Sequence, residues 1–165
     1  MIDRLLFFLT LLATLGSALI AGAFFAFSSF VMEALARLPA AHGIGAMQSI
    51  NVVVINPWFL GAFLGTAAAC ALLAVSALLT WHEPGALPLL TGALLYLFGT
   101  FVVTMAFNVP RNNLLAATKP DGADAAGIWL DYVSGWTAWN QVRTVAALAA
   151  TALLITALLY RGRLP

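Results

Sequence analysis

The segment from Pro57 to Thr80 reads PWFLGAFLGTAAACALLAVSALLT and contains no charged residue. About 20 apolar residues in an α-helix cross the roughly 30 Å of hydrocarbon in a bilayer, so this segment is long enough to span it. Three more segments of this kind surround it: Leu5–Met32, Ala86–Val109 and Trp136–Tyr160. Because lipid offers no partner to backbone polar groups, the pattern predicts four membrane helices.

The composition supports the same fold class. Of 165 residues, 63% are hydrophobic and 8% are charged, whereas a soluble domain carries about a quarter charged residues. We therefore expect one transmembrane domain over residues 1–165: an all-α, integral membrane, antiparallel four-helix bundle in contact with the lipid bilayer. The net charge of +1 does not indicate a nucleic-acid partner. The single cysteine, Cys70, excludes a four-helix quinone–disulfide oxidoreductase.

The second predicted helix is extended. Residues 44–80 would form a helix of about 55 Å, which exceeds the bilayer. Either this helix projects from the membrane or it bends near Pro57, whose ring opposes the preceding turn. Gln48 and Asn51 share one face of the extension and are predicted to point at the other three helices. The other helices are expected at about 5–32, 86–109 and 136–160, with a further short helix around residues 124–133.

The orientation of the bundle follows from its positive charges. The first apolar run is about twice the length of a signal-peptide core, so we interpret it as an uncleaved helix. The termini carry three arginines, and the opposite loops carry two arginines and a lysine. We discount Arg111 because it belongs to a polar cluster, and expect cytoplasmic termini in a bacterial inner (plasma) membrane. Small residues every four positions in the first two helices serve internal packing or a homo-oligomer.

Most of the unusual polar residues lie at one end of the four segments. They follow the first and third segments and precede the second and fourth, so an antiparallel bundle places them on one side. The set is Ser28, Ser29, Glu33, Gln48, Asn51, Asn56, Asn108, Arg111, Asn112, Asn113, Asn140 and Arg143. Polar groups in an apolar setting need partners, so we expect them to converge on one pocket at the membrane surface.

Each part of this set has more than one interpretation. The asparagines around Pro110 either cap a helix end or donate to a ligand oxygen. Gln48 and Asn51 are either interhelical hydrogen-bonding groups or ligand contacts. Trp136, Asn140 and Arg143 lie on one helix face, and an arginine within a membrane helix suggests function.

Arg143 has two further interpretations, and the positions of the histidines bear on metal binding. The alternatives for Arg143 are a side chain that reaches to the membrane surface and an ion pair with Glu33. The two histidines, His42 and His82, lie at opposite ends of the predicted bundle. We therefore predict that no metal is bound within one protomer.

Four motifs resemble, in order, the anthrone oxygenase-like family of small membrane proteins. They are FSSFVM at Phe27–Met32, MQSIN at Met47–Asn51, NVPRN at Asn108–Asn112 and WTAWNQVRT at Trp136–Thr144. The resemblance covers almost the whole chain. It implies an oxygenase of the kind that converts an anthrone to an anthraquinone with O₂, without a metal or flavin cofactor. Gln141 stands where the family leads us to expect a histidine, and Arg111 where an apolar residue is frequent.

The resemblance implies a membrane oxidoreductase, a monooxygenase acting on an apolar aromatic or quinone-like small molecule. Such a site binds a flat ring, stabilises an enolate oxygen and provides a base. The candidate catalytic residues are Arg143, Arg111, Asn108, Asn140 and Glu33, with His42 as an alternative base. The candidate substrate-binding residues are Gln48, Asn51, Asn112, Trp129, Trp136 and Trp139. The alternative is a non-catalytic membrane protein that binds a lipid, quinone or partner subunit; without an internal repeat, a transporter is disfavoured.

Overall fold

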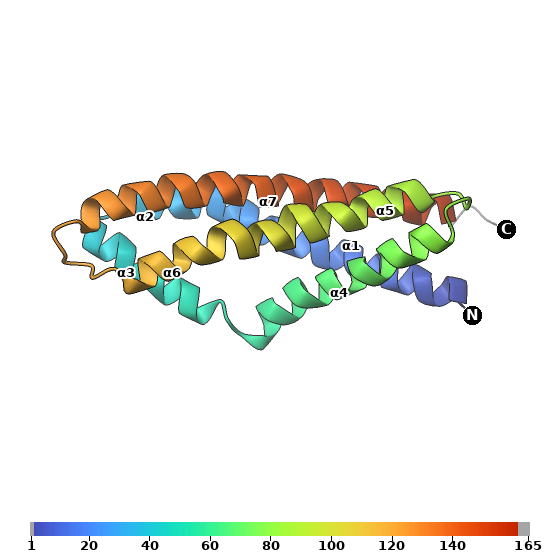
Figure 1. Ribbon diagram of the computed structural model, residues 1–165, viewed down its shortest axis with the longest axis horizontal. Coiled ribbons are helices and arrows are strands. Elements are labelled where there is room, and N and C mark those ends of the chain that lie inside the picture. The colour runs from blue at the N-terminus through green and yellow to red at the C-terminus, as the bar shows by residue number, and fades with distance from the viewer. Residues whose placement is uncertain (1, 162–165) are drawn as a thin grey trace.

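The structure, a computed structural model, describes residues 2–161 and the side chains of residues 4–160. The side chains of Arg161 and Arg163, two of the terminal charges used to predict orientation, lie outside this range. The described chain forms four antiparallel helical rods (Figure 1). Their elements are α1 (Ile2–Ala26), the π-helix η1 (Phe27–Val31) and α2 (Met32–Ala36); α3 (Ala40–Val53) and α4 (Pro57–Leu79); α5 (Ala86–Leu94), the π-helices η2 (Leu95–Val102) and η3 (Thr104–Asn108), and α6 (Val109–Ala117); and α7 (Ala125–Arg161).

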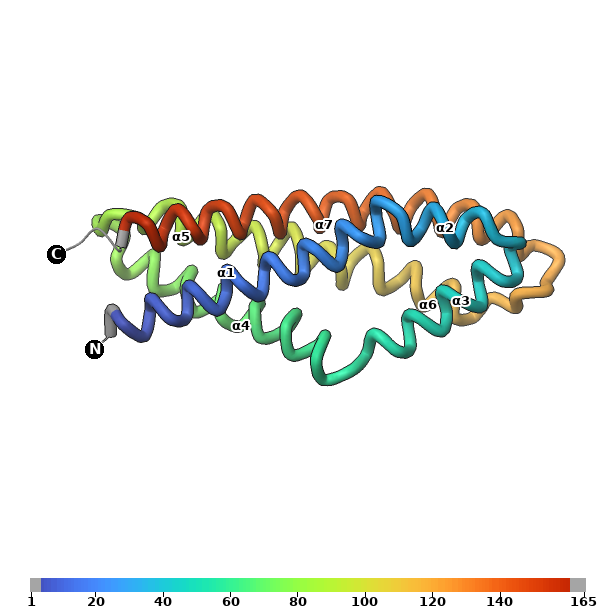
Figure 2. The backbone as a smooth tube through the Cα atoms, turned by 180° about the vertical axis from the view of Figure 1, so that it is seen from behind, coloured from blue at the N-terminus to red at the C-terminus, as the bar shows by residue number. Residues whose placement is uncertain are grey.

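The predicted membrane bundle is confirmed. Within the described residues, four helical stretches are long and apolar enough to cross a membrane: 4–36, 57–79, 86–117 and 125–160. The start of α1 and the end of α7 lie at the same end of the molecule (Figure 2). The protein is therefore an integral membrane protein, with its described ends on one side.

The second rod is two helices and not one continuous helix over residues 44–80. The chain turns at Val54–Asn56, and α4 begins at Pro57. The Asn56 side-chain oxygen accepts hydrogen bonds from the backbone amides of Trp58 and Phe59, at 3.0 Å each. Asparagine at the N-cap followed by proline at the first helical position is a strong helix start. The bend near Pro57 is thus the alternative that the structure adopts.

The other three rods are longer than the sequence predicted. The first continues through η1 to Ala36, and the third continues through η2 and η3 to Ala117. Pro110 does not end the third rod: it closely follows the wide turns of η3, and the helix continues past it to Ala117. The short helix expected around residues 124–133 is the beginning of the single 37-residue helix α7.

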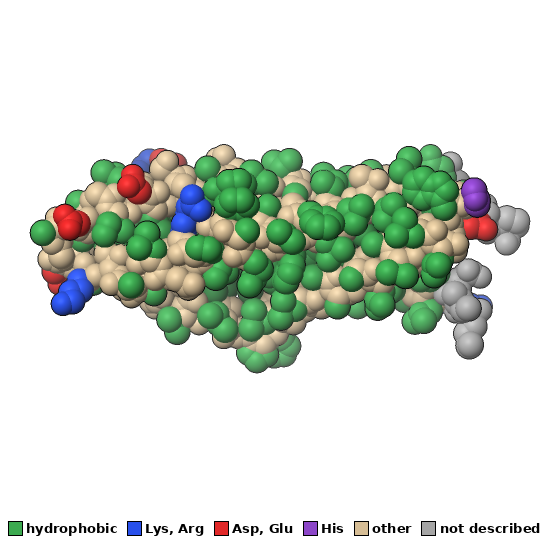
Figure 3. All heavy atoms as spheres, viewed as in Figure 1, with side chains coloured by type: hydrophobic (Ala, Val, Ile, Leu, Met, Phe, Trp, Pro, Cys, Tyr) green, Lys and Arg blue, Asp and Glu red, His purple; other side chains and the backbone are tan. Residues whose placement is uncertain are grey.

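Two hydrophobic cores divide the molecule along its length. The larger core joins α1, α4, α5, η2 and the second half of α7, and is centred on side chains such as Leu73, Tyr96 and Leu154. The smaller core joins α2, α3, α6 and the start of α7, around Ile44 and Trp129. On the face shown in Figure 3, charged side chains lie toward the two ends, one of them well inward of the left end, and hydrophobic side chains cover most of the rest. The candidate site lies between the two cores.

Candidate functional site

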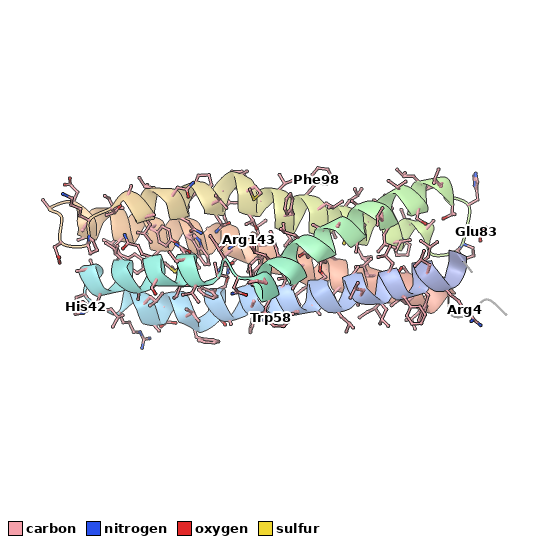
Figure 4. All side chains as sticks on the ribbon, turned by 90° about the horizontal axis from the view of Figure 1, so that it is seen from below. Arg4, His42, Trp58, Glu83, Phe98 and Arg143 are labelled. Atoms are coloured by element: carbon pink, nitrogen blue, oxygen red, sulfur yellow. The ribbon has the colours of Figure 1, made fainter. Side chains whose placement is uncertain are left out.

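Arg143 is the central polar residue of the interior. Its side chain is only 3% exposed, and Figure 4 shows it in the middle of the bundle. Nη1 donates to Thr104 Oγ1 at 3.1 Å, and Nη2 donates to Asn140 Oδ1 at 2.6 Å. Nε is buried and has no hydrogen-bond partner. The guanidinium is therefore held in place while one of its donors stays unused.

No carboxylate among the described side chains balances this buried cation. Among the side chains of residues 4–160, the one ion pair joins the exposed Glu33 and Arg37. The predicted alternative in which Glu33 pairs with Arg143 is therefore wrong. The guanidinium carbon instead lies 4.1 Å from the ring centroid of Phe24 and 5.2 Å from that of Trp136. These rings attract a cation but leave its charge uncompensated.

Asn140 and Asn108 join the neighbouring rods to α7. Asn140 Nδ2 donates to the Phe24 carbonyl at 2.7 Å and to Ser28 Oγ at 2.5 Å. Asn108 Nδ2 donates to the Trp136 carbonyl at 3.1 Å, whereas its buried Oδ1 has no partner. Both asparagines are at most 1% exposed. The centre of the site thus holds an unpaired donor on Arg143 and an unpaired acceptor on Asn108.

An aromatic stack extends from Arg143 toward the smaller core. The rings of Trp129 and Tyr132 lie 5.7 Å apart at 12°, and those of Tyr132 and Trp136 lie 6.3 Å apart at 26°. Asn112 Oδ1 accepts from both Tyr132 Oη and Trp136 Nε1, each at 2.9 Å. The buried donors Trp129 Nε1 and Asn51 Nδ2 have no partner. This region therefore combines flat apolar surfaces with unsatisfied polar groups.

Two π-helices contribute to the same layer. Ser28 belongs to η1, and Thr104 and Asn108 are the first and last residues of η3. A π-helical turn inserts an extra residue into a helix, changes which side chains point inward, and is frequent at functional sites. Here each of these three side chains makes a hydrogen bond to α7. The sequence alone did not reveal these wide turns.

Four other predicted site residues lie outside the central network. Glu33 is exposed on α2, and Arg111 donates to the Phe107 carbonyl in its own rod. Gln48 donates to two carbonyls at the end of α6, at 2.8 and 3.0 Å. Trp139 stacks on the Phe107 ring at 3.6 Å. The alternative base, His42, is exposed on α3.

Tyr132, Thr104 and Phe24 are parts of the site that were not predicted from the sequence. Tyr132 had a detectable signal, because residues three and four apart share a helix face and it lies between Trp129 and Trp136. Thr104 precedes Asn108 by four residues and carried the same signal. Phe24 looked like one of many apolar residues, and only its contact with Arg143 distinguishes it.

Two hollows of the structure lie beside the network and not in it. An open apolar groove of about 530 Å³ runs along the outside of η2 and α7, and includes Gly99 and Gln141. A hollow of about 320 Å³ lies at the loop around Lys119 and Asp124. Gln141, the departure from the family pattern, thus faces away from Arg143. Within the described residues, no three His, Cys, Asp or Glu side chains are grouped to hold a metal ion.

Comparison with known proteins identifies the family. The family model described as anthrone oxygenase matches residues 58–153, more than half of the chain. The matched region covers α4 except Pro57, the whole third rod, and α7 as far as residue 153, and so includes Arg143. No significant match was found among curated proteins or among solved structures. With the match covering this much of the chain, the protein belongs to the anthrone oxygenase family.

Proposed function

We propose that the protein is a membrane-embedded oxygenase that uses O₂ to oxidise an apolar aromatic ketone or quinone-like molecule at Arg143. The observation that carries this proposal is the buried guanidinium without a carboxylate. An uncompensated charge inside a membrane bundle is costly, and such residues usually mark a functional site. An anionic oxygen of a bound ligand would supply the missing charge and accept from the free Nε.

The chemistry that fits this site begins with an enolate. An anthrone that loses a proton from its ring methylene becomes an electron-rich enolate, whose oxygen carries negative charge. A preorganised cation in a low-dielectric site stabilises such charge strongly. Trp129, Tyr132 and Trp136 stack on one another beside Arg143, and an aromatic ring system that parts this stack would find flat partners there. Arg143 would therefore act as the enolate-stabilising residue, with Asn140 and Thr104 fixing its orientation.

The oxidation then balances without a further reactant. The enolate transfers one electron to O₂, which gives a substrate radical and superoxide. Their recombination forms a carbon–oxygen bond, and protonation gives a hydroperoxide. Cleavage of its O–O bond with loss of the remaining hydrogen on that carbon releases water and leaves a second carbonyl. The sum is one anthrone and one O₂ converted to one anthraquinone and one water.

The proposal is tested with anthrone as probe and purified protein in nanodiscs. We expect absorbance of anthraquinone and consumption of O₂ to show turnover by the unmodified protein. The turnover rate of Arg143→Ala should be about 10²–10³-fold lower, which is the effect of removing one group that stabilises an oxyanion. Arg143→Lys should recover the rate only in part, because an ammonium lacks the planar fork. Arg37→Ala, which removes an exposed arginine, is the matched control.

A structural role of the same network is the second candidate. It is favoured by the bonds of Asn140 to the Phe24 carbonyl and Ser28, which join α7 to the first rod. If Arg143→Ala and Asn108→Ala only lower the melting temperature and retain turnover or ligand binding, the catalytic proposal is refuted.

We also propose that the termini face the cytoplasm of a bacterial inner membrane. Labelling of terminal tags in intact cells tests this orientation.

A further inference from the structure

The bend between α3 and α4, residues 52–58 and here called the elbow, is an apolar projection. Val52, Val53, Ile55 and Trp58 expose between 68% and 88% of their surface. Figures 1 and 2 show the elbow standing out from the side of the bundle, far from both ends. A contiguous apolar surface of this kind indicates contact with lipid or another protein.

The charges of the chain set the depth of the elbow in the bilayer. No charged residue lies between Arg4 and Glu33 or between Glu83 and Arg111. These intervals correspond to about 42 Å of helix, close to the roughly 40–45 Å of a bilayer with its headgroups. The 23 residues of α4 cover about 34 Å of that span, starting from the Glu83 end. The elbow therefore lies near the boundary between headgroups and acyl chains, on the side opposite the termini. Its exposed apolar side chains contact lipid there.

The end of the molecule opposite the termini extends beyond the elbow into water, and the smaller core closes this end. Met32, Ile44, Met47, Leu115 and Trp129 are each at most 3% exposed. They fill the space between α2, α3, α6 and the start of α7, beyond the Arg143 network. A ligand that arrived from the water on this side would have to part these packed helices.

A line of aromatic rings joins the elbow to Arg143, and its inner members Phe63 and Phe24 are core side chains that are 5% and 6% exposed. Phe59, in the first turn of α4, stacks on Phe63 with centroids 6.1 Å apart. Phe63 meets Phe24 edge-on at 6.5 Å, and Phe24 lies 4.1 Å from the guanidinium carbon. The described hydrogen bonds of the elbow are all local, and include three made by the Asn56 side chain. The elbow is thus lightly restrained where it borders this line.

We propose that the elbow is inserted in the bilayer boundary and is the entrance through which a lipid-dissolved aromatic molecule reaches Arg143, past Phe59, Phe63 and Phe24. The substrate class is then a molecule that partitions into the membrane. The nature of the ligand rests on the proposed function, whereas the position of the elbow in lipid does not.

The position of the elbow is tested by thiol labelling in liposomes. Cys70→Ala removes the single, buried cysteine and provides the background. Val53→Cys reports on the elbow, and His42→Cys, on the same helix and the same side, controls for orientation. A membrane-impermeant sulfonated maleimide should label position 42 and leave position 53 almost unlabelled. Equal labelling at both positions would overturn the proposal, whatever the protein binds.

The entrance is tested by binding kinetics in nanodiscs, with anthraquinone as probe and tryptophan fluorescence as signal. Asn56→Ala removes the side-chain bonds that hold the elbow, so association and dissociation rates should both rise about fivefold, the scale of one net hydrogen bond. Kd should stay unchanged, because Asn56 does not touch the site. Thr118→Val removes one local bond at the aqueous end and should change neither rate.

The outcomes separate the two proposals. Unchanged rates in Asn56→Ala, or faster binding in Thr118→Val, would refute entry at the elbow while leaving an Arg143-dependent activity intact. Anthraquinone that fails to bind the unmodified protein, or that binds equally to Arg143→Ala, counts against the proposed function. The labelling experiment then still decides whether the elbow lies in lipid.

Discussion

Replacing Asn140 with aspartate would give Arg143 the anion that the site lacks. Asn140 Oδ1 lies 2.6 Å from Nη2 and the residue is 0% exposed. Two charges about 4 Å apart at an effective dielectric constant near 20 attract by about 4 kcal/mol. Against this stand several kcal/mol for burying a carboxylate and about 1–3 kcal/mol for the lost donor to the Phe24 carbonyl. The sum is a net cost of a few kcal/mol, at about 2–4 °C per kcal/mol for a chain of this size, so we expect Asn140→Asp to fold with a melting temperature lowered by about 10 °C.

Turnover should respond very differently from stability. An internal carboxylate on the guanidinium competes with the enolate oxygen, so anthrone oxidation should fall about 10²–10³-fold. Asn113→Asp adds the same charge at an exposed position of α6 and should leave turnover unchanged. The measurements are anthraquinone absorbance and thermal unfolding of the same nanodisc sample. Full turnover in Asn140→Asp, or a loss that only follows the fraction of unfolded protein, would refute the role given to Arg143.

The remaining predictions concern the packing of α3 and an exposed candidate base. A Cβ at Gly43 would lie 2.7 Å from the Trp129 ring, so Gly43→Ala should destabilise the protein by about 1–3 kcal/mol. Gly45 faces open space, so Gly45→Ala in the same helix should stabilise the protein by about 0.5–1 kcal/mol. Thermal unfolding of both variants tests these two predictions, and equal shifts in melting temperature would contradict them. Glu33 makes only an exposed ion pair with Arg37, so Glu33→Gln should retain anthrone turnover; a rate that collapses in this variant would restore Glu33 as a base.

The family and the membrane bundle could be predicted from the sequence because their signals are local and strong. Four charge-poor segments of sufficient length leave only helices as a way to satisfy the backbone in lipid. The antiparallel order then places the polar ends together, and this explains why Asn108, Asn140 and Arg143 were found in advance. The bend before α4 was one of two alternatives, because Asn56 and Pro57 carry the signature of a helix start.

Other features depend on contacts between distant segments, which the sequence alone could not define. Arg111 and Arg143 both follow asparagines near helix ends, yet one bonds its own rod and the other is buried among three rods. The π-turns of η1 and η3 lie where Ser28, Thr104 and Asn108 bond to α7, and propensity does not specify them. Membrane insertion is fixed by local composition, since each segment alone must satisfy the lipid around it, whereas three of the rods extend beyond their predicted bounds. Which polar groups are paired, and which stay unpaired at Arg143, is decided only when the rods pack, because burial removes water as the alternative partner.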